Sequence, residues 1–198
     1  MIKKRGFFGV TMETKIRFGT DGWRGLIAHD FTFDNVSRCA QGVCDYLNQK
    51  CSSRASLVVG YDTRFLSKEF AETVAKVGAA NGLQIYLSTE PLPTPVLSFN
   101  VLEKGADGAI IITASHNPGN WNGFKYKPEY GGSATQEITD SLEYFIEQSG
   151  LPKSLSLEQS INEGLIAYDD PTPAYIKKIE SLIDLDLIRQ SGLYVVVD

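Results

Sequence analysis

The sequence predicts an α/β fold: a three-layer α/β/α domain with a largely parallel, mixed sheet, followed by the first elements of a second α/β domain. Short continuous apolar runs, typical of strands buried on both faces, alternate with amphipathic stretches of about 10–15 residues, typical of helices. Such alternation produces βαβ units, whose crossovers are right-handed. The 198 residues are enough for one domain and part of another.

Three buried strands are predicted, over residues 57–61, 83–87 and 109–112. Each is a short run of mostly apolar residues, and the stretches between them have the length and periodicity of helices. Strands joined by such helices lie parallel, so their carboxyl ends meet at one edge of the sheet.

Three helices are predicted before and between these strands. The first begins after Thr32, whose hydroxyl can accept a hydrogen bond from the first turn, and its apolar residues recur at steps of three and four. Ser67 is expected to cap the second helix in the same way. Thr94 is expected to cap the third, with Pro95 at the first helical position and Gly105 as the C-terminal stop.

A fourth helix is predicted over residues 135–148, and two amphipathic stretches follow over residues 155–163 and 173–188. The chain then ends on an apolar run, in which residues 195–197 are expected to form a buried strand. Because a lone strand cannot bury both of its faces, this strand is predicted to be the first of a second domain.

These elements divide the chain into three parts. Residues 1–13 are expected to be an N-terminal extension, residues 14–150 the first domain, and residues 151–198 linker helices with the truncated start of the second domain. The extension begins with basic residues, but the apolar stretch after them is too short for the core of a signal peptide.

The net charge of −5 and the pI near 5.1 argue against nucleic acid or an anionic membrane as partner, because both need a clustered basic face. No apolar run approaches the ~20 residues that span a bilayer. The three cysteines are odd in number and lack metal-ligating spacing. We therefore expect reduced thiols and a cytoplasmic location.

The most informative segment is Thr-Ala-Ser-His-Asn-Pro-Gly at residues 113–119, directly after the third predicted strand. Open α/β sheets bind ligands at this edge, and the turn presents Ser115 and His116 there for attack on a substrate or donation to it. The pair is no hydrolase triad, because neighbouring side chains of an extended segment point apart and no G-x-S-x-G surrounds the serine. A serine that only serves the turn is the alternative.

Two further segments carry candidate groups. Lys125, in Asn-Gly-Phe-Lys, can exchange a proton with a substrate hydroxyl if it lies on a rigid segment beside the serine, and an ordinary surface lysine is the alternative. Residues 18–25, Phe-Gly-Thr-Asp-Gly-Trp-Arg-Gly, set glycines around Thr20 and Arg24, so that backbone N–H groups and a guanidinium can approach an anion. The alternative there is a surface turn with a buried tryptophan.

Together these segments resemble the α-D-phosphohexomutase family, which comprises phosphoglucomutase, phosphomannomutase and phosphoglucosamine mutase. Residues 113–118 resemble its phosphoserine loop, residues 122–125 its lysine motif and residues 18–25 its N-terminal signature. Gly-Tyr-Asp-Thr-Arg at residues 60–64 and Pro-Thr-Pro at residues 93–95 also fall in the family's order. The resemblance implies the family's first domain and the entry into its second.

The resemblance implies an intramolecular phosphotransferase that interconverts hexose 1-phosphate and hexose 6-phosphate through a phosphoserine and a bisphosphate intermediate, with this chain as its N-terminal part. Ser115 would carry the phosphoryl group, and Lys125 would exchange a proton with the sugar hydroxyl. Arg24 and His116 would stabilise charge as the group moves.

Substrate or its phosphate would bind Thr20, Arg24, Arg64, Asn117 and Lys125. Two of these assignments have a structural alternative that the residues themselves favour. Arg64 can form an ion pair with Asp62 that shapes the loop, because the two lie two residues apart. Asn117 and Asn122 can brace the loop instead of contacting sugar.

The family resemblance also implies one Mg²⁺ ion, bound to the phosphate on Ser115 and to an aspartate loop of the second domain. No D-x-D-x-D cluster occurs in this chain, so the remaining ligands are expected beyond residue 198. A glucose 1,6-bisphosphate-type activator, hexose phosphates and the missing C-terminal domains are the other expected partners.

Two alternative functions stay open at this point. One is phosphoglucosamine mutase of the same family, although Trp23 favours the phosphoglucomutase/phosphomannomutase type. The other is a short, non-catalytic domain that binds sugar phosphates. A reading frame that continues past residue 198 would exclude the second.

Overall fold

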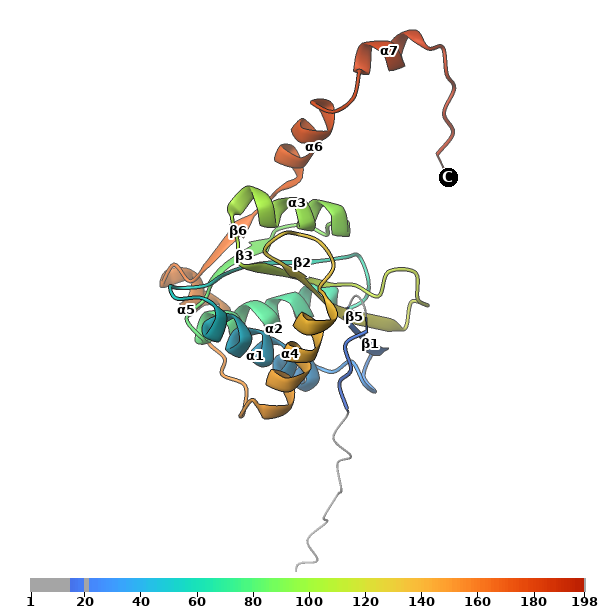
Figure 1. Ribbon diagram of the computed structural model, residues 1–198. Helices are drawn as coiled ribbons and strands as arrows, with labels where there is room; N and C mark the ends of the chain where they lie inside the picture. The colour runs from blue at the N-terminus through green and yellow to red at the C-terminus, as the bar shows by residue number, and fades with distance from the viewer. Residues whose placement is uncertain (1–14, 20–21, 198) are drawn as a thin grey trace, which may run out of the picture.

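The computed structural model describes residues 15–19 and 22–197 and has one sheet with helices on both faces (Figure 1). The strands are β1 (Trp23–Leu26), β2 (Ser56–Tyr61), β3 (Gln84–Ser88), β4 (Gly108–Ile112), β5 (Trp121–Pro128) and β6 (Ile166–Asp169). The helices are α1 (Phe33–Lys50), α2 (Ser67–Ala80), α3 (Thr94–Lys104), α4 (Gln136–Gln148), α5 (Leu157–Asn162), α6 (Thr172–Glu180) and α7 (Leu185–Gln190). The expected extension at residues 1–13 lies outside the described residues.

The sheet is mixed and largely parallel, as predicted. Its strand order is β1-β5-β4-β2-β3-β6. The four strands β4, β2, β3 and β6 run parallel to one another, whereas β5 lies antiparallel to both β4 and β1. The carboxyl ends of β2 and β4 therefore lie at the same edge, and β5 begins there.

Two helical layers bury the two faces of the sheet, which confirms the three-layer prediction. Figure 1 shows α1, α2 and α4 on one face and α3 on the other. Along β4, Ile110 and Ile112 pack into the larger cluster beneath α1 and α2, while Ala109 and Ile111 pack with α3. This double burial is the physical reason why the strand is continuously apolar.

The cap of the first helix is confirmed, but two others differ from the prediction. The Thr32 hydroxyl accepts a hydrogen bond from the backbone of Asn35 at the start of α1. Ser67 does not cap α2, because it is already the first helical residue and its hydroxyl donates to Asp62. The residue before the helix is Leu66, in the left-handed region. Helix α3 likewise starts one residue early, so Thr94 is its first helical residue.

The C-terminal third departs most from the prediction. Strand β6 was not predicted, because it is only four residues long and half polar, and it forms by pairing with β3. The stretch expected as one helix over residues 173–188 is two helices, since Asp184 caps a new start at α7. The strand expected at residues 195–197 is wrong for the described chain, where these residues are 80–93% exposed and pair with no other described strand.

The cysteines of α1 give a direct test of the helical layer. Cys39 and Cys44 are buried, and burial raises the pKa of both thiols, that of Cys44 to about 12. Cys51 follows the end of α1 and is only partly buried. Because the thiolate is the reactive form, Ellman's reagent should label Cys51 alone in the folded chain and all three thiols after unfolding. Equal labelling of two or more thiols in the folded chain would contradict this packing.

Candidate active site

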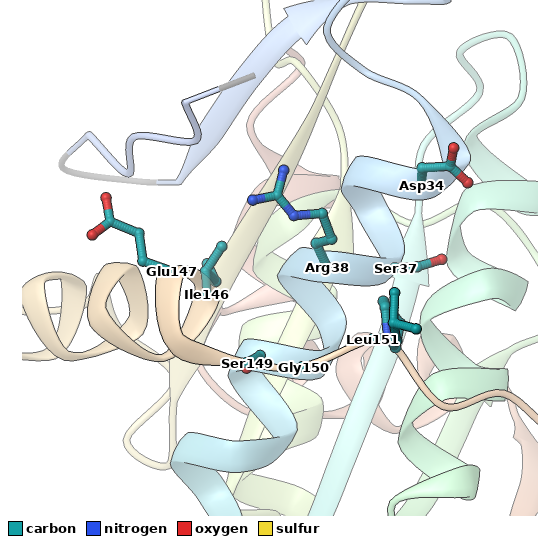
Figure 2. Close-up of a pocket in the computed structure, with 9 residues that line it drawn as sticks. Asp34, Ser37, Arg38, Ile146, Glu147, Ser149, Gly150 and Leu151 are labelled. Atoms are coloured by element: carbon teal, nitrogen blue, oxygen red, sulfur yellow. The ribbon is translucent and has the colours of Figure 1, made fainter. Parts of the chain in front are cut away.

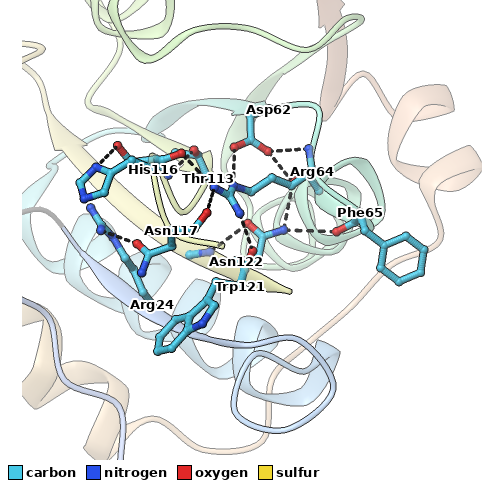
Figure 3. A network of polar contacts seen from close by, with 12 residues as sticks. Arg24, Asp62, Arg64, Phe65, Thr113, His116, Asn117, Trp121 and Asn122 are labelled. Carbon is cyan, nitrogen blue, oxygen red and sulfur yellow. Dashed lines mark hydrogen bonds and ion pairs between the residues drawn. The ribbon is translucent and has the colours of Figure 1, made fainter. Parts of the chain in front are cut away.

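The segment that follows β4, residues 113–120, is named the serine loop. It lies at the carboxyl edge of the sheet, next to the segment that follows β2, because the backbone N–H of Asp62 donates to the carbonyl of Ile112 at 3.0 Å. Figure 3 shows the polar contacts that join the two segments. Ser115 is exposed on this loop, as a nucleophile that meets a substrate must be.

A tight turn holds Ser115 in an unusual backbone conformation. Its φ of 58° lies in the left-handed region, and its N–H donates to the hydroxyl of Thr113 at 3.0 Å. The N–H of Asn117 donates to the carbonyl of Ala114, which closes the turn. The expectation that the side chains of Ser115 and His116 point apart is wrong, because the segment is not extended: Ser115 Oγ lies 3.4 Å from His116 Nδ1.

Arg24 reaches the serine loop from the neighbouring strand. In the β1–β5 ladder it lies opposite Gly123, and its guanidinium donates to Asn117 Oδ1 at 2.7 Å. A Cβ atom at Gly123 would lie 2.6 Å from the carbonyl oxygen of Thr113 and 3.1 Å from Arg24 Cγ. Glycine at position 123 is therefore what lets the strand carrying Arg24 and the start of the serine loop come this close.

Lys125 lies on the same face of the sheet as Arg24. It is opposite Ile111 in the β4–β5 ladder and two residues from Gly123, so these residues share the face that α3 covers elsewhere. Its side chain is buried, unlike that of an ordinary surface lysine. Gly22, at φ 116°, packs on this strand, where a Cβ would lie 2.8 Å from Lys125 Cα.

Arg64 is bonded to the chain itself. Its two terminal nitrogens donate to the backbone carbonyls of Ser115, Asn117, Pro118 and Trp121 at 2.6–3.1 Å. Its Nε lies 3.4 Å from a carboxylate oxygen of Asp62, whose other oxygen accepts the Arg64 backbone N–H. All five N–H donors of the guanidinium thus have partners within the chain, which agrees with the loop-shaping alternative, and its contact with phosphate stays a prediction.

A buried pair of polar side chains supports this arrangement. The amide of Asn122 donates to the hydroxyl of Ser67 at 2.9 Å, and that hydroxyl donates to Asp62 at 2.8 Å. Both side chains are at most 1% exposed. The bracing role expected of Asn122 is confirmed, whereas the sequence showed Ser67 only as a helix cap, since nothing in its neighbourhood reveals a partner 55 residues away.

Two predicted site residues remain, Asn117 and Thr20. Asn117 accepts hydrogen bonds from Arg24 and Arg64, which agrees with the expected bracing of the loop, and its contact with substrate stays a prediction. Thr20 lies outside the described residues. Within the described part of the chain, no group of three or more His, Cys, Asp or Glu side chains is placed to hold a metal ion.

The surface hollows differ in whether predicted site residues line them. One of about 590 Å³ lies between the start of α1 and the end of α4, where Arg38, Glu147 and Leu151 line it (Figure 2). None of the predicted site residues lines it. A smaller hollow of about 310 Å³ lies past the end of β2, where Asp62, Arg64 and Lys68 form part of its wall. No helix in the described part of the chain has the length and apolar character to cross a membrane.

Comparison with known proteins identifies the family. The sequence model of "Phosphoglucomutase/phosphomannomutase, alpha/beta/alpha domain I" matches residues 15–152. This span is more than half of the chain and includes the serine loop, Arg24 and Lys125. The chain therefore belongs to the phosphoglucomutase/phosphomannomutase family and contains its domain I.

Individual relatives agree with this assignment. The chain is 37% identical over 188 residues to a phosphoglucomutase of Staphylococcus saprophyticus and 36% identical over 198 residues to one of Staphylococcus aureus. A crystal structure from Thermus thermophilus, named as a phosphomannomutase, has 34% identity and a TM-score of 0.80 over 93% of this chain and 39% of its own. The two curated matches cover 90–93% of this chain but only 33–34% of the relatives themselves.

Replacement of Gly123 tests the close approach of Arg24 to the serine loop. Gly123→Ala should lower the free energy of unfolding by about 2 kcal/mol, because the added methyl meets backbone oxygen atoms that cannot move aside freely. Gly119→Ala, in the serine loop and with open space around it, should change this free energy by less than about 0.5 kcal/mol. Urea unfolding of both variants measures the difference, and equal effects would refute the packing described.

Proposed function

We propose that this chain is the N-terminal part of a hexose phosphate mutase of the phosphoglucomutase/phosphomannomutase type, in which Ser115 carries the phosphoryl group. Membership of the family supports the reaction class. The observation that carries the assignment is the serine loop, which presents an exposed hydroxyl at the carboxyl edge of the sheet. This hydroxyl, on Ser115, lies two residues before Asn117, which accepts a hydrogen bond from Arg24. The enzyme's other domains would supply the rest of the cleft, since the chain spans about a third of its curated relatives.

The proposed reaction consists of two phosphoryl transfers. In the first, the P–O bond to Ser115 Oγ breaks, a P–O bond to the free hydroxyl of a hexose monophosphate forms, and the hydroxyl proton leaves the sugar. The resulting bisphosphate reorients in the cleft, so that its other phosphate faces Ser115. In the second, its other phosphate returns to Ser115 Oγ, so the serine is reloaded and the isomeric monophosphate is released.

Each side chain of the edge has a role that follows from its charge and position. Lys125 exchanges the proton with the sugar hydroxyl, and it needs a fixed position to do so, which its buried place on β5 supports. Arg24 stabilises the negative charge of the transferring group, because a guanidinium offers several donors to phosphoryl oxygens. His116, in contact with Ser115 Oγ, stabilises the same charge or the leaving serine oxygen.

Magnesium and a bisphosphate activator stay predictions. The described residues do not by themselves fit a magnesium site, because no cluster of ligating side chains is present among them, and the chain would offer only the phosphate on Ser115. Neither transfer is routed through the ion. A glucose 1,6-bisphosphate-type activator would reload a serine that had lost its phosphate to water.

The substrate is proposed as a hexose monophosphate, with glucose and mannose phosphates as the first candidates. The two staphylococcal relatives are named phosphoglucomutase, and the structural relative from Thermus thermophilus is named phosphomannomutase. Parallel assays with glucose 1-phosphate, mannose 1-phosphate and glucosamine 1-phosphate would rank these hexoses.

Removal of the proposed phosphoryl carrier gives the central test. In the complete enzyme, Ser115→Ala should lower kcat by about 10⁴-fold or more, because no other hydroxyl can take the group at that position. Ser133→Ala, an exposed turn serine away from the edge, should leave kcat unchanged. Intact-mass analysis should find one added phosphoryl group on the native enzyme, mapped to Ser115. Substantial turnover by Ser115→Ala would refute the proposed function.

The 198-residue chain alone gives a second test. It should convert no measurable glucose 1-phosphate, with or without glucose 1,6-bisphosphate and Mg²⁺, because the proposed cleft needs domains that its relatives have and this chain does not span. A coupled assay for glucose 6-phosphate measures the conversion. Clear activity would show that the edge described above is a complete site.

A further inference from the structure

The contacts of Arg64 fix which way the peptide units of the serine loop point. Four carbonyl oxygens of residues 115–121 accept hydrogen bonds from this one guanidinium. In a trans peptide the N–H points opposite to the C=O of the same unit, and the described residues contain no cis peptide. Because the carbonyls of Ser115 and Pro118 face Arg64, the N–H groups that follow them, on His116 and Gly119, face away from it.

These two N–H groups have no acceptor among the described residues. That of His116 belongs to the residue that directly follows Ser115, whose hydroxyl would carry the phosphoryl group. Backbone N–H groups gathered around a left-handed residue are a recurrent way of binding anions, and dipoles fixed in advance cost no reorientation during the reaction. Without Arg64, the same peptide units could turn carbonyl oxygens toward the phosphoryl group and repel it.

Arg64 is itself held in place from the interior. Asp62 contacts both its backbone N–H and its guanidinium, and Ser67 donates to that carboxylate. Ser67 in turn accepts from Asn122 at the start of β5. The anchor thus joins the start of α2, the end of β2 and the strand after the serine loop, so the guanidinium has one defined position relative to Ser115.

We propose that Arg64 is a positioning residue for phosphoryl transfer, which turns the backbone N–H groups of the serine loop toward the phosphoryl group on Ser115. The Asp62–Ser67–Asn122 chain of hydrogen bonds is its anchor. The proposal rests on the function proposed above. Arg64 itself touches neither substrate nor phosphate, because its donors are bonded to carbonyls and to Asp62.

Arg64→Lys in the complete enzyme tests this role, because a lysine ammonium cannot span four carbonyls with a planar fork. Its kcat, normalised to the folded fraction from circular dichroism, should fall by about 10²-fold, as expected when a reacting group is misplaced by about 1 Å. Its KM should stay within about threefold, because no ground-state contact is lost.

Arg54→Lys is the matched control. Arg54 also donates to two backbone carbonyls, those of Gly82 and Leu83, but at the turn before β3, at the amino edge of the sheet. Its kcat and KM should stay within about twofold of the native values. The proposal is overturned if Arg64→Lys behaves like Arg54→Lys, or if its KM rises while kcat is kept, which would indicate direct contact with substrate.

Asp62→Asn decides the question if Arg64→Lys does not fold. It keeps the size of the side chain and removes the charge beside the guanidinium, so kcat should fall by about tenfold with little change in KM. An unchanged kcat would overturn the proposal. Ser115→Ala, measured in the same series, separates the two ideas: turnover by that variant refutes the proposed function, whereas its inactivity beside an unaffected Arg64→Lys refutes only the role of Arg64.

Discussion

The shape of the serine loop depends on one largely buried cation that is bonded to carbonyl oxygens. A loop at the edge of a sheet has no ladder partners, so its backbone groups must find others or face water. Arg64 satisfies three of these carbonyls and that of Trp121 at the start of β5, and the charge makes each bond stronger than a neutral one. The chain thereby holds an exposed serine rigidly without burying it.

Close contact between backbones is the second constraint on this edge. Two glycines, Gly22 and Gly123, allow β1 and its preceding turn to lie against β5 at distances that any side chain would prevent. The antiparallel ladders on either side of β5 then bring Arg24 and Lys125 to one face of the sheet. Cationic side chains and an exposed hydroxyl are thus brought together from β1 and from the distant segment that contains β4, the serine loop and β5.

Much of the fold was predictable, because its signals are local. Apolar runs identified β2, β3 and β4, and Thr32 marked the start of α1. Strand β6 was missed because its four residues become a strand only through pairing with β3. For the site, motif positions indicated Ser115, Arg24 and Lys125, but the role of Ser67 and the four carbonyl bonds of Arg64 depend on segments more than 50 residues away. The positive φ of Ser115 leaves no mark on the sequence beyond the neighbouring turn residues.

The left-handed backbone at position 115 bears on which hydroxyl amino acid can occupy it. Threonine has the same nucleophilic oxygen, but its Cβ carries a second branch, and β-branched residues at positive φ are rare outliers because that branch meets the backbone. Serine tolerates the conformation more readily. The geometry of the turn, rather than the chemistry of the alcohol, thus explains why a threonine would be a poor replacement here.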